Sequence, residues 1–230
     1  RGILIEGYHS DCGDLSSYRP RPFSMPFLLP WNLVVRPAVR LMNALYIRKP
    51  DGRSIVDYNS FFYPLDRIAN WSHLYGKSGF HQFQCVVPEE HARDALYCML
   101  RYCLDFLGGS TLVVIKRFGS IRSPGLLSFP IPGYTITLDF PAKGESSRML
   151  VTKLEKLPLD AGGRVNPYKS RMMSLATFES SFPHWKRILP WLDPCAESRF
   201  SRRLGIGCTY HSKNNDSAIN QVSSQDRSRP

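Results

Sequence analysis

The chain has 230 residues, of which 43% are hydrophobic and 12% aromatic, so it can bury a sizeable core in one large domain or two small ones. Only 21% of the residues are charged, which excludes an intrinsically disordered chain. No run of about eighteen uncharged apolar residues occurs, which excludes a membrane-spanning helix in this sequence. Thirty lysines and arginines against 19 acidic residues give a formal net charge of +11.

That positive charge suits nucleic acid, an anionic membrane surface or a phosphorylated substrate. Because no dense basic block is interleaved with aromatic residues, we expect no nucleic-acid partner. The chain opens Arg1-Gly2-Ile3, without a Met or a secretory signal, and we expect it to be a fragment or a processed chain.

Cysteine and histidine positions predict neither a disulfide framework nor a metal site. No two cysteines form a CxxC pair, and no two histidines have metal-ligand spacing. A chain of this length folds without disulfides, so we expect reduced thiols and a cytoplasmic location. The cysteines are Cys12, Cys85, Cys98, Cys103, Cys195 and Cys208.

The first predicted unit, residues 1–49, contains a short strand at 3–5, a proline-rich connector and an amphipathic helix that begins near Arg36. Pro37 is tolerated there because the first turn of a helix leaves its backbone N–H groups unpaired. Two interpretations stay open. The helix packs on its own domain, or residues 31–48 contact a membrane surface peripherally.

Strand and helix patterns alternate through residues 50–161, the second predicted unit and the expected substrate-binding domain. Two of the strands follow each other with no helix between them, which favours an α+β fold with a largely antiparallel sheet, covered by helices on one face. The predicted strands are 55–63, 80–87, 111–118 and 133–140, and the predicted helices are 64–75, 89–107 and 146–157.

The third predicted unit, residues 162–205, begins at a Gly-Gly turn and is helical over 174–192, with two proline interruptions. Beyond it the composition changes to Ser, Asn, Asp, Gln and Arg. We expect residues 206–230 to be a disordered basic tail.

Alternation along the predicted strands separates a polar face from an apolar face. Amide and hydroxyl side chains are an unusual choice for a solvated face, and they suit a cleft that hydrogen-bonds a sugar or polyol. A half-exposed sheet whose polar side simply meets water is the other interpretation. The polar positions are Gln82, Gln84, Thr135, Thr137 and Asp139, while Lys116 and Phe118 share one side of 111–118.

No nucleotide-binding glycine motif, P-loop or serine-hydrolase elbow occurs. Instead, short motifs follow one another in order: FYPLD at 62–66, GFHQFQCVVP at 79–88, KRFG at 116–119, LSFPIPGY at 127–134, LDFP at 138–141, GGR at 162–164 and SRRL at 201–204. This series resembles the FAD-dependent oxidoreductases of the vanillyl-alcohol-oxidase type, including the aldonolactone oxidases and oxidases of polyprenyl-phosphoryl ribose. The likeness covers residues 50–205 and, more weakly, 21–48.

The resemblance implies the C-terminal part of such an enzyme, with a sheet that roofs the flavin. Residues 162–205 would then be a return segment that packs on an FAD-binding domain, and this chain alone would hold no FAD and be inactive. The implied reaction is hydride transfer to flavin N5 from a sugar or polyol alcohol, either polyprenyl-phosphoryl ribose-like or aldonolactone-like. A truncated, non-catalytic ligand- or partner-binding domain with the same fold is the alternative.

The resemblance also implies roles for single residues. Lys169 is the expected catalytic residue, a cation beside the substrate hydroxyl and the flavin, and Asn166 is expected to contact the cofactor with it. Three positions depart from the pattern of the mycobacterial members of this family: Phe62 stands in place of Tyr, Thr135 in place of Asn and Thr137 in place of Cys. The particular substrate, which could be phosphorylated or lipid-linked, therefore stays open. The expected substrate-binding residues are Gln82, Gln84, Lys116, Phe118, Thr135, Thr137 and Phe62.

Overall fold

The structure, a computed structural model, describes residues 3–12, 23–48, 52–63, 68–107, 110–193 and 196–206. Apart from Ile206, the predicted basic tail lies outside these ranges. Among the described residues, no helix is long and apolar enough to cross a membrane.

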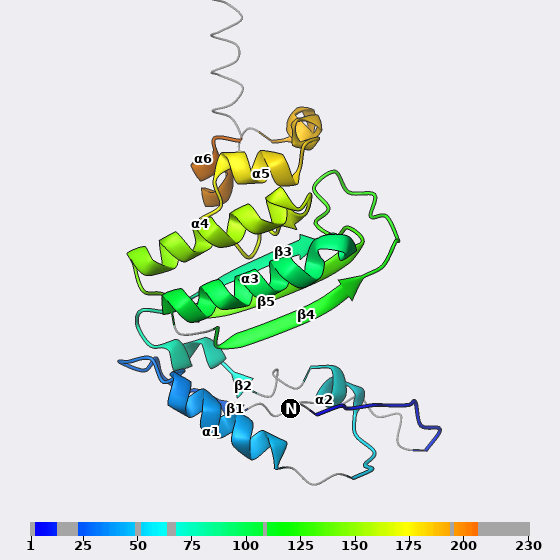
Figure 1. Cartoon of the computed structure of the whole chain (residues 1–230), viewed down its shortest axis with the longest axis vertical. Helices are drawn as coiled ribbons and strands as arrows, with labels where there is room; N and C mark the ends of the chain where they lie inside the picture. The colour runs from blue at the N-terminus through cyan, green and yellow to red at the C-terminus, as the bar shows by residue number, and fades with distance from the viewer. Residues whose placement is uncertain are drawn as a thin grey trace, which may run out of the picture.

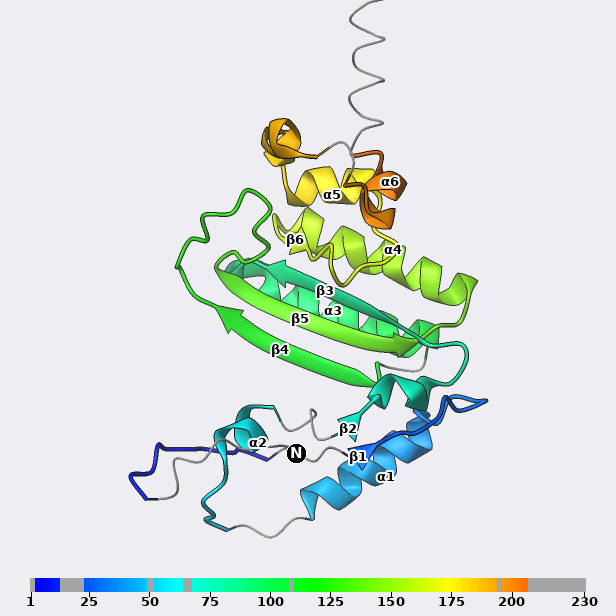
Figure 2. The ribbon, with the colours of Figure 1, turned by 180° about the vertical axis from the view of Figure 1, so that it is seen from behind.

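A four-stranded antiparallel sheet lies at the centre of the molecule, with the strand order β4-β5-β3-β6 (Figures 1 and 2). Its register places Gln84 opposite Thr137 and Lys116 opposite Thr135. The predicted α+β fold is therefore confirmed, although β6 was not predicted. The strands are β3 (Phe80–Val87), β4 (Leu112–Phe118), β5 (Gly133–Pro141) and β6 (Arg164–Val165).

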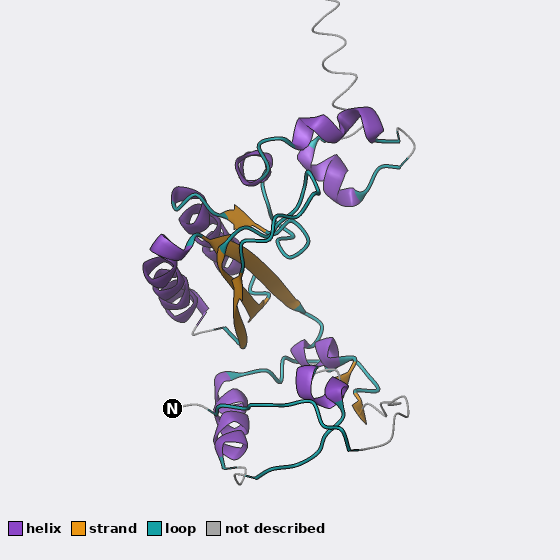
Figure 3. Cartoon of the chain, turned by 90° about the vertical axis from the view of Figure 1, so that its right-hand side faces the viewer, coloured by secondary structure: helices purple, strands orange, loops and turns teal. Residues whose placement is uncertain are grey.

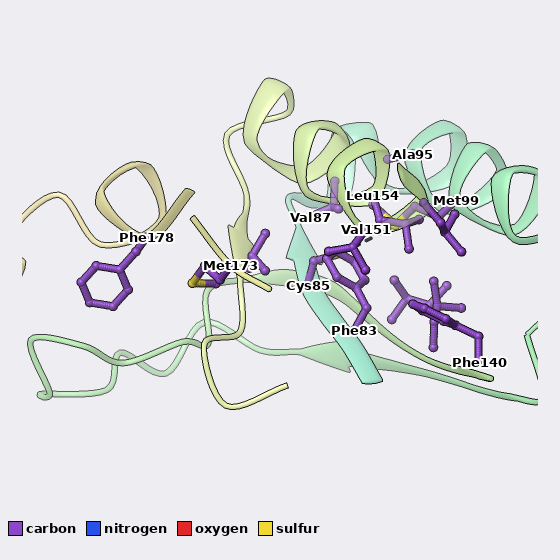
Figure 4. Close-up of a cluster of buried hydrophobic side chains, with 14 of the residues drawn as sticks. Phe83, Cys85, Val87, Ala95, Met99, Phe140, Val151, Leu154, Met173 and Phe178 are labelled. Atoms are coloured by element: carbon purple, nitrogen blue, oxygen red, sulfur yellow. Dashed lines mark hydrogen bonds between the residues drawn. The ribbon is translucent and has the colours of Figure 1, made fainter. Parts of the chain in front are cut away.

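Two long helices, α3 (Glu89–Leu107) and α4 (Glu145–Asp160), cover the apolar face of this sheet, as Figure 3 shows from the side. Phe83 of β3, Met99 of α3 and Leu154 of α4 meet in the core between sheet and helices and are fully buried (Figure 4). The opposite face of the sheet carries the amide and hydroxyl side chains, so the predicted division into two faces is confirmed.

Gly163 allows the chain to return from α4 to the sheet at very close range. A Cβ atom at this position would collide with the carbonyl oxygen of Val86 on β3 and would lie 2.9 Å from the carbonyl oxygen of Pro158. The glycine therefore lets β6 pair with β3, and this pairing sets the path of the loop that follows.

Short elements form the N-terminal part of the molecule, at the lower end of Figure 1. The two-residue strands β1 and β2 pair in parallel, and the predicted helix is present as α1 with Pro37 in its first turn. The elements are β1 (Phe23–Ser24), α1 (Arg36–Ile47), α2 (Tyr58–Phe62), β2 (Ile68–Ala69) and the 3-10 helix η2 (Trp71–Tyr75).

Three sequence-based predictions for this part are wrong. Residues 3–12 form no strand, and their apolar side chains are exposed. Helix α2 replaces most of the strand predicted at 55–63, because the Asp57 carboxylate caps it by accepting 3.0 Å hydrogen bonds from two backbone N–H groups. Residues 64–67 of the predicted helix 64–75 lie outside the described residues. In the rest, Asn70 adopts a left-handed conformation (φ 55°), so the chain forms β2, and only residues 71–75 are helical, as the 3-10 helix η2.

The C-terminal part packs three short helices around one aromatic ring. Phe178 is 1% exposed, and its ring lies 5.4 Å from that of Phe182, 5.9 Å from that of Trp185 and 5.9 Å from that of Phe200. These contacts join α5 (Leu175–Ser181), η3 (Trp185–Trp191) and α6 (Arg199–Leu204).

Candidate functional site

The loop that follows β6 is fastened to the polar face of the sheet through Asn166. Its backbone N–H donates to the carbonyl oxygen of Gln84 at 2.8 Å, and its side-chain Nδ2 donates to Gln84 Oε1 at 2.7 Å. Gln84 Nε2 in turn donates to Thr135 Oγ1 at 3.1 Å. These hydrogen bonds fix the loop against β3 and β5.

A second line of hydrogen bonds runs parallel to the first and ends at a buried carboxylate. Lys169 Nζ donates to Gln82 Oε1 at 3.1 Å, and Gln82 Nε2 donates to Asp139 Oδ2 at 3.3 Å. Because the carboxylate accepts from the amide NH₂ group, the amide oxygen of Gln82 is turned toward the lysine. Asp139 therefore orients Gln82, and Gln82 holds the ammonium group of Lys169.

Asp139 is 1% exposed, and its Oδ1 has no hydrogen-bond partner among the described residues. Burial raises the pKa of this carboxyl group above its ordinary value, while the hydrogen bond from Gln82 and the positive charge of Lys169 act in the opposite direction. Burying a charged carboxylate with one oxygen unpaired costs free energy, and protonation removes that charge. The folded protein is therefore more stable when Asp139 is protonated.

We expect Asp139→Asn to remove one component of the pH dependence of stability. The folded state binds the Asp139 proton more tightly than the unfolded state does. The resulting stability is complete below the ordinary carboxyl pKa and is lost as the pH rises through the raised pKa. Asparagine has no such loss, so the variant should be more stable near neutral pH by on the order of 1 kcal/mol.

Urea unfolding of both proteins at several pH values between acid and neutral measures this difference. The variant should gain on the parent only as the pH rises. A constant difference at every pH would show that Asp139 does not titrate in this way.

An open pocket of about 480 Å³ lies beside Lys169, between the start of β3, the loop after β6 and α6. Four cationic side chains line it, and no Asp or Glu is among its described lining residues. Burial and the nearby charge of Arg171 lower the pKa of His81, which also lines the pocket. The pocket is therefore suited to an anionic group. Its cations are Lys169, Arg171, Arg199 and Arg203.

The remaining predicted site residues lie in three different places. Thr137 is half-buried on the same face as Gln84, and Lys116 is exposed at the far end of that face. Phe118, next along β4, packs its ring 6.0 Å from that of Phe129. Phe62 lies on α2 with 62% of its surface exposed, and the structure does not place it in the pocket.

Sequence reasoning assigned no role in the site to Asp139 or to the pocket arginines. Alternation did place Asp139 on the polar face with Thr135 and Thr137, but it was not among the expected substrate-binding residues. The sequence contained a weaker sign of the pocket arginines. Arg199 and Arg203 are four residues apart, which places both on one face of a helix, but no such spacing connects them to Arg171.

Comparisons with known proteins identify relatives of this chain. The chain is 31% identical over 195 residues to the decaprenylphosphoryl-β-D-ribose oxidase of Mycolicibacterium smegmatis, a match that covers 81% of this chain and 42% of the oxidase. This chain is a relative of that oxidase. It is also 27% identical over 145 residues, 60% of this chain and 39% of the other, to an uncharacterised protein encoded in the mprA 5′ region of Streptomyces coelicolor. No family model matches the chain.

The relationship supports a flavin-dependent oxidoreductase. This chain spans less than half the length of either relative. The match to the oxidase covers most of the described structure, and flavin is the cofactor that the relationship implies for the family.

Proposed function

We propose that this chain is the substrate-binding domain and return segment of an FAD-dependent oxidoreductase that oxidises an alcohol of a phosphorylated or lipid-linked sugar. The observation that carries the proposal is the position of Lys169. Its ammonium group is held by Gln82 and Asp139 at the edge of a pocket lined by cations, in a chain related to a sugar oxidase.

The residues around Lys169 fit a flavin. A fixed ammonium group stabilises negative charge on a reduced ring, and the acid-free pocket beside it repels neither that charge nor a phosphate. Lys169 and Asn166, both in the loop after β6, are the residues that would contact the cofactor. When bound, FAD supplies the hydride acceptor.

Gln82 and Gln84 would orient the sugar. Each amide NH₂ group has two hydrogens, and the hydrogen bonds to Asp139 and Thr135 use one from each. The second hydrogen of each amide can be donated to a sugar hydroxyl. Because the other end of each amide is already engaged, the two side chains are held in place before substrate binds.

The pocket favours a phosphorylated substrate over a neutral aldonolactone. Arg171, Arg199 and Arg203 add positive charge next to Lys169, and a neutral sugar would make no use of it. A phosphate bound there would lie beside the residues that orient the sugar. Lys116, at the other end of the polar face, could instead contact a more distant part of the substrate.

The test is a chimera in which this chain replaces the matching segment of the Mycolicibacterium oxidase, purified with bound FAD. Anaerobic mixing with a polyprenyl-phosphoryl pentose should reduce the flavin. An aldonolactone at equal concentration should do so at least about tenfold more slowly, because it brings no anion to the pocket. Equal rates would reject the phosphorylated substrate. No reduction by either compound, with FAD fully retained, would favour a non-catalytic binding domain.

A further inference from the structure

Large apolar side chains gather on the surface of the segment 23–35 and of helix α1 that follows it. On α1, Leu41 is 62% exposed, Met42 61% and Leu45 57%, and the helix has no buried residue. The side chains of the preceding segment that share this exposure are Phe23, Phe27, Leu28, Trp31, Leu33 and Val35. Such a concentration of exposed apolar surface marks an interaction site.

This surface is part of an ordered arrangement rather than a loose arm. The β1–β2 pairing joins Phe23 to Ile68, and Leu33 N donates to the carbonyl oxygen of Leu74 at 2.8 Å. His73 Nδ1 also lies 3.1 Å from the carbonyl oxygen of Met25. The backbone is therefore held against 68–76, while the large apolar side chains stay exposed.

The charge of the same segment is entirely positive. Residues 23–48 contain three arginines and no acidic residue. On α1, Arg36 and Arg40 are one turn apart, and the helical repeat places Leu41 and Leu45 on a different face. An apolar face bordered by arginines is the pattern of a helix that lies in the plane of an anionic membrane surface.

We propose that α1 and the segment 23–35 bind the surface of an anionic lipid bilayer. The apolar side chains would enter the boundary between headgroups and acyl chains, and the arginines would contact lipid phosphates. Trp31, which is 67% exposed, suits the headgroup level. In Figures 1 and 2, α1 lies at the opposite end of the molecule from α5 and α6. This proposal does not depend on the flavin chemistry.

Co-sedimentation of the full chain with lipid vesicles tests the proposal. Vesicles of phosphatidylcholine with about 30 mol% phosphatidylglycerol should bind the chain, and pure phosphatidylcholine vesicles should bind it at least about tenfold more weakly. About 0.5 M salt should weaken the binding to the anionic vesicles.

Two double variants separate the apolar and the electrostatic contributions. Arg36→Gln with Arg40→Gln should weaken binding to anionic vesicles about thirtyfold, since each basic side chain at such a surface contributes about fivefold. Leu41→Glu with Leu45→Glu should reduce binding at least tenfold. The control is Leu104→Glu, the same type of substitution at a 45% exposed position on α3, and it should bind as the parent does.

Two results would overturn the proposal. Binding to neutral vesicles as strong as to anionic ones would remove the role of the arginines. Absence of vesicle binding, together with a dimer that Leu41→Glu and Leu45→Glu dissociate, would show that a second copy of the chain covers this face.

Discussion

Replacing Lys169 with methionine in the flavin-loaded chimera is expected to slow flavin reduction about a hundredfold at saturating substrate. Methionine keeps much of the length and the apolar stem but removes the ammonium group, so packing should change little. A cation that stabilises charge as the hydride leaves contributes mainly in the transition state, and its loss typically costs about 3 kcal/mol. The hydrogen bond to Gln82 is also lost, but water can replace it because both side chains are only half-buried.

Lys153→Met is the matched control for this experiment. It makes the same chemical change at an exposed position on α4, which packs on the opposite face of the sheet, and Lys153 is not among the described lining residues of the pocket. Stopped-flow absorbance should show flavin reduction within about twofold of the parent for this variant. If Lys169→Met retained FAD and reduced it within a factor of about two of the parent, Lys169 would be a surface lysine without a catalytic role.

Phe178→Ala is expected to lower the free energy of unfolding by about 3 to 5 kcal/mol, the usual cost of removing a buried aromatic ring. This ring holds α5, η3 and α6 together. Its loss should also release α6, which carries Arg199 and Arg203, so phosphate affinity in the pocket should fall with stability.

Urea unfolding followed by tryptophan fluorescence measures the stability. Leu175→Ala provides the control, since Leu175 lies on the same helix but is 39% exposed, and it should cost less than about 1 kcal/mol. Equal destabilisation by the two substitutions would show that the aromatic cluster does not hold the C-terminal helices.

The elements predicted correctly are those whose local pattern and packing agree. Helix α3 has acidic residues in its first turn and a continuous apolar stripe, so its predicted and observed ends coincide. On strand β3, Phe83, Cys85 and Val87 are fully buried on one face, and the alternation of the sequence placed Gln82 and Gln84 correctly on the other.

The errors come from short-range contacts that periodicity does not represent. Helix α2 depends on the single cap of Asp57, in a stretch whose aromatic content resembles a strand. The apolar residues near Ile3 predicted a strand, but a strand needs a partner and none lies beside them in the described structure. The cationic pocket could not be derived from alternation either, because Arg171 and Arg203 meet the start of β3 only through the tertiary fold.

The two hydrogen-bond lines from the loop after β6 also determine when this site can form. Asn166 and Gln84 are 82 positions apart in the chain, and Lys169 and Gln82 are 87 apart. Bringing together residues this far apart in the chain costs more conformational entropy than forming α3 or pairing neighbouring strands. These contacts should therefore be among the last to form during folding. A ribosome must release the chain beyond Arg203 before the pocket can close. An anionic ligand that binds in the pocket would then bind only fully folded molecules and would stabilise them relative to partly folded ones.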